Sequence, residues 1–350
     1  MISAQIQAQI KLRGLADTIG FAHLSSQMDL VMQRIEKEQG NQLATILKTK
    51  NIEEADAWPL AIAPHDDYTY VGYLYPLVLK NIKAKTIIIF GVAHKAAKLN
   101  VENDLIFDNF THWCGPYGNV KVSDLRSSII EKLPKDIYQL NDSLQTLEHS
   151  VEAEIPFLQY YNHNVEIISI LVPYMSFDRM NELSQPLAKA IAEVMKEKKL
   201  KWGKDLALLI STDAVHYGDE DWQGRNFAFY GADTKGYNKA VEHENLIMND
   251  CFKDELTSDK IKLFTEYTLK KENYKEYKWT WCGRYSVPLG LLTGFYLGKN
   301  LTIKPLRGSI LGYSNSLDHS HIKVDDLNGM GVTAPANIRH WVGYAAVGFK

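Results

Sequence analysis

Three hydrophobic runs of this chain end on residues that can bind a metal ion or transfer a proton. The run 60–63 leads to His65, the run 86–90 leads to His94, and the run 206–210 leads to Asp213 and His216. In an open α/β sheet, ligands bind in the crevice beyond the carboxyl ends of the strands. If these runs are neighbouring strands, their side chains meet at one edge of the sheet. The pattern therefore predicts a metal site or an acid–base site at that edge.

Asp213 and His216 lie three residues apart beyond the third run. A histidine that borders a metal without binding it can act as a general acid or base near neutral pH. A neighbouring aspartate can fix the tautomer of that histidine or orient the second ring nitrogen of a metal ligand. We therefore predict catalytic roles for His216 and Asp213. The alternative is a turn with a capping aspartate and a surface histidine.

Cys282 is flanked by Trp279 and Trp281 on one side and by Gly283-Arg284 on the other, at the start of an expected helix. A helix N-terminus and a guanidinium both lower the pKa of a thiol, and the thiolate is the form that binds metals or attacks electrophiles. The alternative is a small buried hydrophobic residue. Two histidines and one cysteine suit copper, zinc or iron and leave coordination positions open.

Two further groups of polar residues have more than one interpretation. Asp66 and Asp67 follow His65 directly, and their carboxylates could complete a one- or two-metal hydrolytic site. The sequence Glu-His-Ser at 148–150 opens an expected helix, where Glu and Ser are also favourable as terminal and capping residues. We expect 148–150 either to cap that helix or to take part in the site.

The composition of the 350 residues is ordinary for a globular protein of enzyme size, with 45% hydrophobic and 23% charged residues. The net charge is −3, and positive and negative residues are interspersed along the chain, so the sequence gives no sign of a basic surface for nucleic acids. Three cysteines exclude a disulfide framework. No apolar stretch approaches the roughly 20 residues of a membrane span, and the N-terminal residues 1–11 are too polar for a signal peptide. We expect a cytoplasmic protein.

The hydrophobic pattern predicts one α/β domain over residues 1–350. Core strands are expected over 60–63, 86–90, 165–172 and 206–210, separated by helical segments and hence mostly parallel. Helices are expected over 23–39, 70–81, 124–132, 178–199 and 287–297, a loop or hairpin over 100–122, and late strands over 301–306 and 343–349. The charged region 222–278 is expected to be a helical elaboration without strands.

Several of these segments, in this order along the chain, resemble the motifs of one protein family. They are Ala63-Pro-His65-Asp-Asp-Tyr68-Thr-Tyr70-Val-Gly72, Gly91-Val-Ala-His94, Leu147-Glu148-His149-Ser150-Val-Glu152-Ala-Glu-Ile-Pro156, Ser211-Thr-Asp213-Ala-Val-His216-Tyr-Gly218, Cys282-Gly283-Arg284 and Tyr313-Ser-Asn-Ser316. The sequence from about residue 60 onward thereby resembles the Memo family, which includes the animal mediator of cell motility and the bacterial AmmeMemoRadiSam system protein B group.

The resemblance implies a LigB-like fold, shared with the class III extradiol dioxygenases: a mixed central sheet flanked by helices. Related Memo proteins are described as binding copper or iron through two histidines and a cysteine. The matching positions are His65, His94 and Cys282. The resemblance therefore implies a metal cofactor, with iron or copper favoured over zinc, and a pathway partner of the radical-SAM type.

Three functions are consistent with these residues. The first is a metal-dependent oxidoreductase that acts on a small aromatic or redox-active substrate, with His216 moving protons. The second is a metal-assisted hydrolase that uses Asp66 and Asp67. The third is a non-enzymatic module that binds a metal or a peptide. Redox-active iron or copper would favour the first, and zinc or manganese the second.

Overall fold

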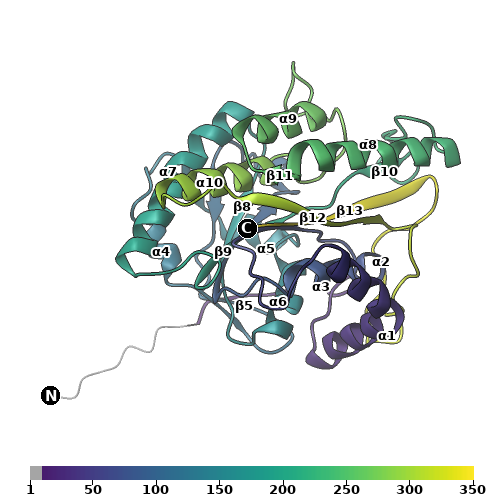
Figure 1. Cartoon of the computed structure of the whole chain (residues 1–350), viewed down its shortest axis with the longest axis horizontal. Helices are drawn as coiled ribbons and strands as arrows, with labels where there is room; N and C mark the ends of the chain where they lie inside the picture. The colour runs from purple at the N-terminus through teal and green to yellow at the C-terminus, as the bar shows by residue number, and fades with distance from the viewer. Residues whose placement is uncertain (1–9) are drawn as a thin grey trace.

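A mixed β-sheet organises the chain in the computed structural model, which describes residues 10–350 (Figure 1). The four predicted core strands are confirmed: β2 (Leu60–Ala63), β3 (Thr86–Val92), β8 (Glu166–Val172) and β9 (Leu206–Ser211). They lie in the order β8-β3-β9-β2 and are all parallel. Next to β2, the sheet continues antiparallel through β13 (His340–Phe349) and β12 (Arg307–Asn315).

Both faces of the central strands are covered, which explains why the strands read as continuous hydrophobic runs. Ile88 and Phe90 of β3 pack against one core, and Ile87 and Ile89 pack against the other. In Figure 1, α7 (Phe177–Glu197) and α10 (Ser286–Asn300) lie above the sheet, and α1 (Ser25–Thr49), α3 (Leu74–Leu79) and α6 (Ile155–Tyr161) lie below it. Each fully buried isoleucine contributes about 1.5–3 kcal/mol of apolar transfer free energy.

The segment 100–122, expected to be a loop or hairpin, contains a hairpin. Its arms are β5 (His112–Trp113) and β6 (Val120–Val122), which pair antiparallel, and β6 pairs parallel with β8. The other short elements are β1 (Leu12–Arg13), β4 (Leu105–Phe107), β7 (Tyr138–Leu140), α4 (Leu125–Ile130), α5 (Asp142–Leu147), and the 3₁₀ turns η1 (Ala96–Leu99) and η2 (Glu152–Glu154).

The region 222–278 is mostly helical, as predicted, and contains α8 (Thr234–Phe252) and α9 (Ser258–Thr268). Both helices lie above the sheet in Figure 1, on the side of α7 and α10. The prediction that this region has no strand is wrong at β11 (Asp254–Glu255), which pairs with the start of β12. A two-residue strand leaves no periodic signal in the sequence, because only the pairing with β12 defines it.

The single helix expected over 70–81 is two helices, α2 (Tyr68–Val71) and α3. Gly72 separates them, with a left-handed φ of 52° that L-residues rarely adopt. A Cβ atom there would lie 2.4 Å from the side chain of Gln39, which belongs to α1. The break therefore lets α1 pack closely against the turn between the two helices.

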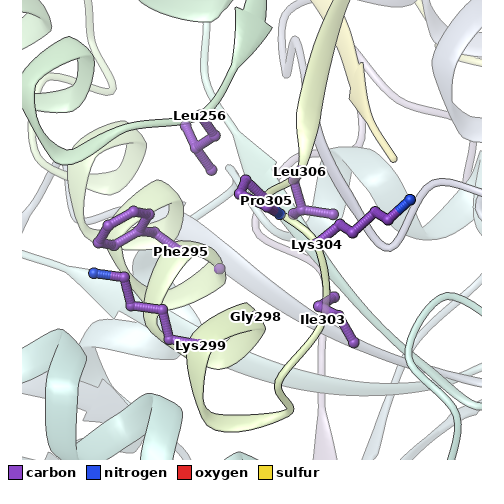
Figure 2. Close-up of a pocket in the computed structure, with 9 residues that line it drawn as sticks. Leu256, Phe295, Gly298, Lys299, Ile303, Lys304, Pro305 and Leu306 are labelled. Atoms are coloured by element: carbon purple, nitrogen blue, oxygen red, sulfur yellow. The ribbon is translucent and has the colours of Figure 1, made fainter.

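The prediction of a strand over 301–306 is wrong, because β12 begins only at Arg307. Thr302 has a left-handed φ of 55°, and Pro305 has no N–H to donate to a sheet. The segment instead runs beside α10 and encloses a cavity of about 60 Å³ with it. Figure 2 shows this cavity, whose lining contains no histidine, cysteine or carboxylate. It lies apart from the residues that could do chemistry.

Within residues 10–350, no helix combines the length and the apolar character that a bilayer crossing requires. The prediction about the polar N-terminal stretch 1–11 falls mostly on residues 1–9, which lie outside the described part of the chain.

Candidate metal centre

The three strand ends that carry potential ligands do meet at one edge of the sheet. Strands β3, β9 and β2 are adjacent and parallel, so their carboxyl ends point the same way. His94, Asp213 and His65 each follow their strand by two residues. The side chains are brought together because parallel register places equivalent positions side by side.

His65 is buried and held at both ends of its ring. Its Nδ1 atom lies 2.9 Å from the hydroxyl of Ser211, and its backbone N–H donates to Asp213 Oδ1 at 2.9 Å. Its Nε2 atom lies 3.4 Å from the sulfur of Cys282 and 3.5 Å from Asp213 Oδ2. Burial, followed by the nearby histidines, lowers the pKa of His65 well below its usual value. The ring is therefore neutral, which is the form that binds a metal.

Cys282 reaches the strand ends through an isolated β-bridge between Val215 and Trp281. Its sulfur accepts the backbone N–H of Asp213 at 3.1 Å. The next residue, Gly283, makes this approach possible, because a Cβ atom there would lie 2.1 Å from Thr212 Oγ1.

The expectation that neighbouring groups lower the pKa of the Cys282 thiol is wrong. Burial, followed by the negative charge of Asp213, raises this pKa well above its ordinary value. Helix α10 begins only at Ser286, and the Arg284 guanidinium stacks over the ring of Tyr277 at 3.6 Å. Desolvation of the thiolate therefore outweighs the favourable neighbours.

His94 is fixed by Glu148, which sequence analysis left without an assigned role. The Nδ1 atom of His94 lies 2.8 Å from Glu148 Oε1, and its backbone N–H donates to Oε2 at 2.7 Å. Burial acts to raise the pKa of Glu148, but His94 and His149 oppose it and the pKa falls to about 2. The carboxylate is therefore charged, and it orients the imidazole so that Nε2 stays available.

His149 also lies in the candidate site, a place that the sequence pattern left open. Its ring stacks on His94 with a centroid distance of 4.9 Å, and it lies 5.7 Å from the ring of His65. Burial lowers its pKa to about 4. The signal in the sequence was its place directly after Glu148, but the same position also fits a helix start.

The potential ligands form two groups that share His65. One contains His94 and His149, and the other contains Asp213 and Cys282; within each group the ligand atoms all lie within 4.8 Å of one another. His94 and Cys282, which the prediction placed in one ligand set, fall in different groups. Both nevertheless line a single cavity of about 80 Å³.

His216 lies at the start of β10 (His216–Gly218), beside β13. Its Nε2 atom is buried and has no hydrogen-bond partner among residues 10–350. Burial, followed by the neighbouring histidines, lowers its pKa to about 3. Asp213 contacts His65 rather than His216, and burial raises the pKa of Asp213 to about 7. Neither role expected for Asp213 is seen: the second ring nitrogen of His65 contacts Ser211, and Asp213 instead accepts the backbone N–H of His65.

The carboxylates of Asp66 and Asp67 form hydrogen bonds with residues outside both ligand groups. Asp66 accepts the hydroxyl of Tyr344 at 2.7 Å, and Asp67 accepts the hydroxyl of Thr333 at 3.0 Å. Burial raises their pKa values to about 7 and about 8. Neither belongs to a group of potential metal ligands within the described chain, so a hydrolytic site built on this pair has less support than the histidine and cysteine cluster.

The fold and this cluster define an α/β protein with a candidate metal centre beyond the carboxyl ends of its parallel strands. The sequence model of the family described as Memo-like protein matches residues 30–327. This match covers most of the chain, which therefore belongs to the Memo-like family.

Curated relatives carry the same family name. The chain is similar to MEMO1 family proteins of Pyrococcus abyssi (29% identity over 45% of this chain and 52% of the relative) and of Sulfolobus acidocaldarius (30% identity over 55% of this chain and 59% of the relative). A third, from Methanothermobacter thermautotrophicus, is 27% identical over 46% of this chain and 54% of its own length. The matched part thus spans about half the length of these relatives.

Proposed function

We propose that this protein binds a redox-active metal ion through His65, His94 and Cys282 and acts as a metal-dependent oxidoreductase on a small aromatic or redox-active molecule. The observation that carries the proposal is the position of His65, whose Nε2 atom lies 3.4 Å from the sulfur of Cys282 while its ring contacts that of His94. His65 therefore links both groups of potential ligands.

The donor set fits a metal ion. His65 and His94 each have Nδ1 occupied, by Ser211 and by the Glu148 carboxylate, and each can offer Nε2. A histidine held in this way by a second residue is the usual arrangement of a metal-binding imidazole. Burial keeps His65 neutral, and a bound cation would oppose the raised pKa of the Cys282 thiol by favouring the thiolate.

Iron or copper is our proposed cofactor in preference to zinc, because mixed imidazole and thiolate ligands suit all three metals but only the first two exchange electrons. Such an ion would supply electron transfer and polarise a bound oxygen atom. The chain itself would exclude water and orient the ligands through Ser211 and Glu148. His216, whose buried Nε2 atom has no hydrogen-bond partner among residues 10–350, would be the proton-handling group.

The biological setting is proposed by analogy. A cytoplasmic location is consistent with three cysteines that form no disulfide in the described chain. A small-molecule substrate is favoured over a peptide ligand, because the cavity beside His94 and Cys282 measures only about 80 Å³. A radical-SAM pathway partner follows from the resemblance to the bacterial group.

The test is metal stoichiometry by elemental analysis of protein purified with and without oxygen. We expect about one iron or copper ion per wild-type chain. His65→Ala should lose the metal, because it removes a direct ligand, whereas His216→Ala should retain it and lose turnover. His163→Ala is the matched control, since His163 is exposed and lies outside both ligand groups.

Three further variants distinguish the ligand groups. Cys282→Ser and His94→Ala should each lose the metal, and His149→Ala should retain it. If His149→Ala loses the metal while Cys282→Ser retains it, the three histidines are the ligands and our assignment of Cys282 is wrong. Zinc in place of iron or copper under both conditions would contradict the oxidoreductase. Loss of metal from His216→Ala would make His216 a ligand and remove its proton-handling role.

A further inference from the structure

Arg284 is a buried cation that pairs with no carboxylate among residues 10–350. Its side chain is only 5% exposed, and its Nε atom has no hydrogen-bond partner among residues 10–350. No carboxylate of the described chain lies within 4 Å of its guanidinium. Arg13, which is also buried, pairs with Glu152, and Arg126 pairs with the buried Asp108. The fold therefore supplies acidic partners to other arginines but not to Arg284.

Three tyrosines surround this guanidinium. Its central carbon lies 3.6 Å from the ring centroid of Tyr277, 4.7 Å from that of Tyr285 and 5.6 Å from that of Tyr174. The aromatic faces stabilise a cation and fix the plane of the guanidinium. They add no negative charge, and arginine cannot lose its own charge by deprotonation. A buried charge of this kind is costly unless an anion pairs with it.

The cavity beside Arg284 provides room for that anion. Arg284, its three tyrosines, His94 and Cys282 line the same cavity of about 80 Å³. This space holds several water molecules or one small polar group. An anion bound to the guanidinium would therefore lie next to two of the proposed metal ligands.

We propose that Arg284 binds the carboxylate of a small substrate and so orients the substrate against the metal centre; this rests on the proposed function. A planar carboxylate matches the planar fork of a guanidinium. A phosphate dianion fits less well, because the cluster already contains the Glu148 carboxylate, which pairs with His94. Apart from histidine, Arg284 is the one cationic side chain in the cavity lining, so the cavity can balance one negative charge of a ligand.

The experiment measures binding of three probes to the full chain by calorimetry: benzoate, the neutral isostere benzamide and phenyl phosphate. Wild-type protein should bind benzoate, bind benzamide at least about tenfold more weakly, and prefer benzoate to phenyl phosphate. Arg284→Met should weaken benzoate binding by about tenfold or more, the loss expected for a charged hydrogen-bonded pair. Arg284→Lys should recover part of it, because it keeps the charge but not the fork.

Arg307→Met is the matched control, since Arg307 is exposed on β12 and pairs with Asp254. It should bind benzoate as the wild type does. Equal binding of benzoate and benzamide by the wild type, or no binding of benzoate, would overturn the proposal even if Arg284→Met fails to fold. Unchanged benzoate binding by Arg284→Met would overturn it as well. If phenyl phosphate binds more tightly than benzoate and this binding depends on Arg284, the group that Arg284 recognises is a phosphate ester and not a carboxylate.

The same measurement separates this inference from the proposed metal site. Benzoate binding that depends on Arg284 and persists in metal-free His65→Ala supports the carboxylate site whether or not the wild type holds a metal. Wild-type protein that contains iron or copper but does not distinguish benzoate from benzamide would keep the metal site and remove the role of Arg284.

Discussion

Two buried polar clusters both contain side chains of the segment 279–284, and they differ in how completely their carboxylate, imidazole and guanidinium groups are hydrogen-bonded. We call the first the Glu244 cluster. Its Glu244 Oε1 atom accepts the indole N–H groups of Trp279 at 2.6 Å and Trp281 at 2.7 Å. The Oε2 atom accepts the backbone N–H of Val215 at 3.2 Å. Both carboxylate oxygens are used.

The second is the cluster at the strand ends, where groups remain unsatisfied. Nε2 of His216 and Nε of Arg284 are buried without partners in the described chain, and a cavity adjoins Arg284. Since buried polar groups are normally hydrogen-bonded, such exceptions need an explanation. The comparison indicates that the Glu244 cluster is structural, and it supports the proposal that a bound ion or ligand completes the strand-end cluster.

The largest effect should come from breaking the Glu244 cluster. Glu244→Ala leaves two indole N–H groups and one backbone N–H buried without acceptors, at a cost of about 3–5 kcal/mol in the free energy of unfolding. Chemical denaturation measures this cost. The metal content of the folded fraction should not change, and a loss of metal without a loss of stability would contradict the structural role.

The Glu244 cluster should also respond to pH. Burial raises the pKa of Glu244 from 4.5 to about 7. Below pH 4.5 the carboxyl is protonated in both folded and unfolded chains, and its stabilising contribution is lost as pH rises through about 7. The loss amounts to about 3 kcal/mol.

Glu244→Gln isolates this contribution, because glutamine does not titrate. The difference in unfolding free energy between the wild type and this variant should shift by about 3 kcal/mol in favour of the variant between about pH 4.5 and pH 8. A constant difference would show that Glu244 has an ordinary pKa in the folded protein.

The close packing beside Cys282 gives the next effect. Gly283→Ala would place a Cβ atom 2.1 Å from Thr212 Oγ1, and the resulting shift should cost about 1–3 kcal/mol. Because the shift moves Cys282 away from His65, metal affinity should fall as well. Gly14→Ala is the control, since a Cβ at Gly14 meets no atom within 4 Å. Equal stability of the two variants would contradict the packing argument.

The smallest effect should come from the support of His94. Glu148→Gln keeps an acceptor for the Nδ1–H of His94 but removes the negative charge, so metal affinity should fall by about tenfold, at the lower end of the effects of such supporting residues. Competition with a chelator measures this change. Unchanged affinity would mean that His94 does not bind the ion or does not need Glu148.

The core strands and the convergence of their ends could be predicted from sequence. The runs at 60–63, 86–90 and 206–210 are buried on both faces, so their composition alone marks them. The strand expected at 301–306 was wrong because an apolar run cannot show that Thr302 adopts a left-handed φ. The short strand β11 could not be found because its pairing partner lies about fifty residues away.

The sequence by itself determined which residues follow the parallel strands. A hydrophobic run followed closely by His65, His94 or Asp213 identifies both the strand and the residue beyond its end. Only the tertiary structure decided which side chains meet. It divided the potential ligands between two groups, added His149, and turned Asp66 and Asp67 towards Tyr344 and Thr333. It also raised the pKa of Cys282, because burial acts through the surroundings of a side chain and not through its neighbours in sequence.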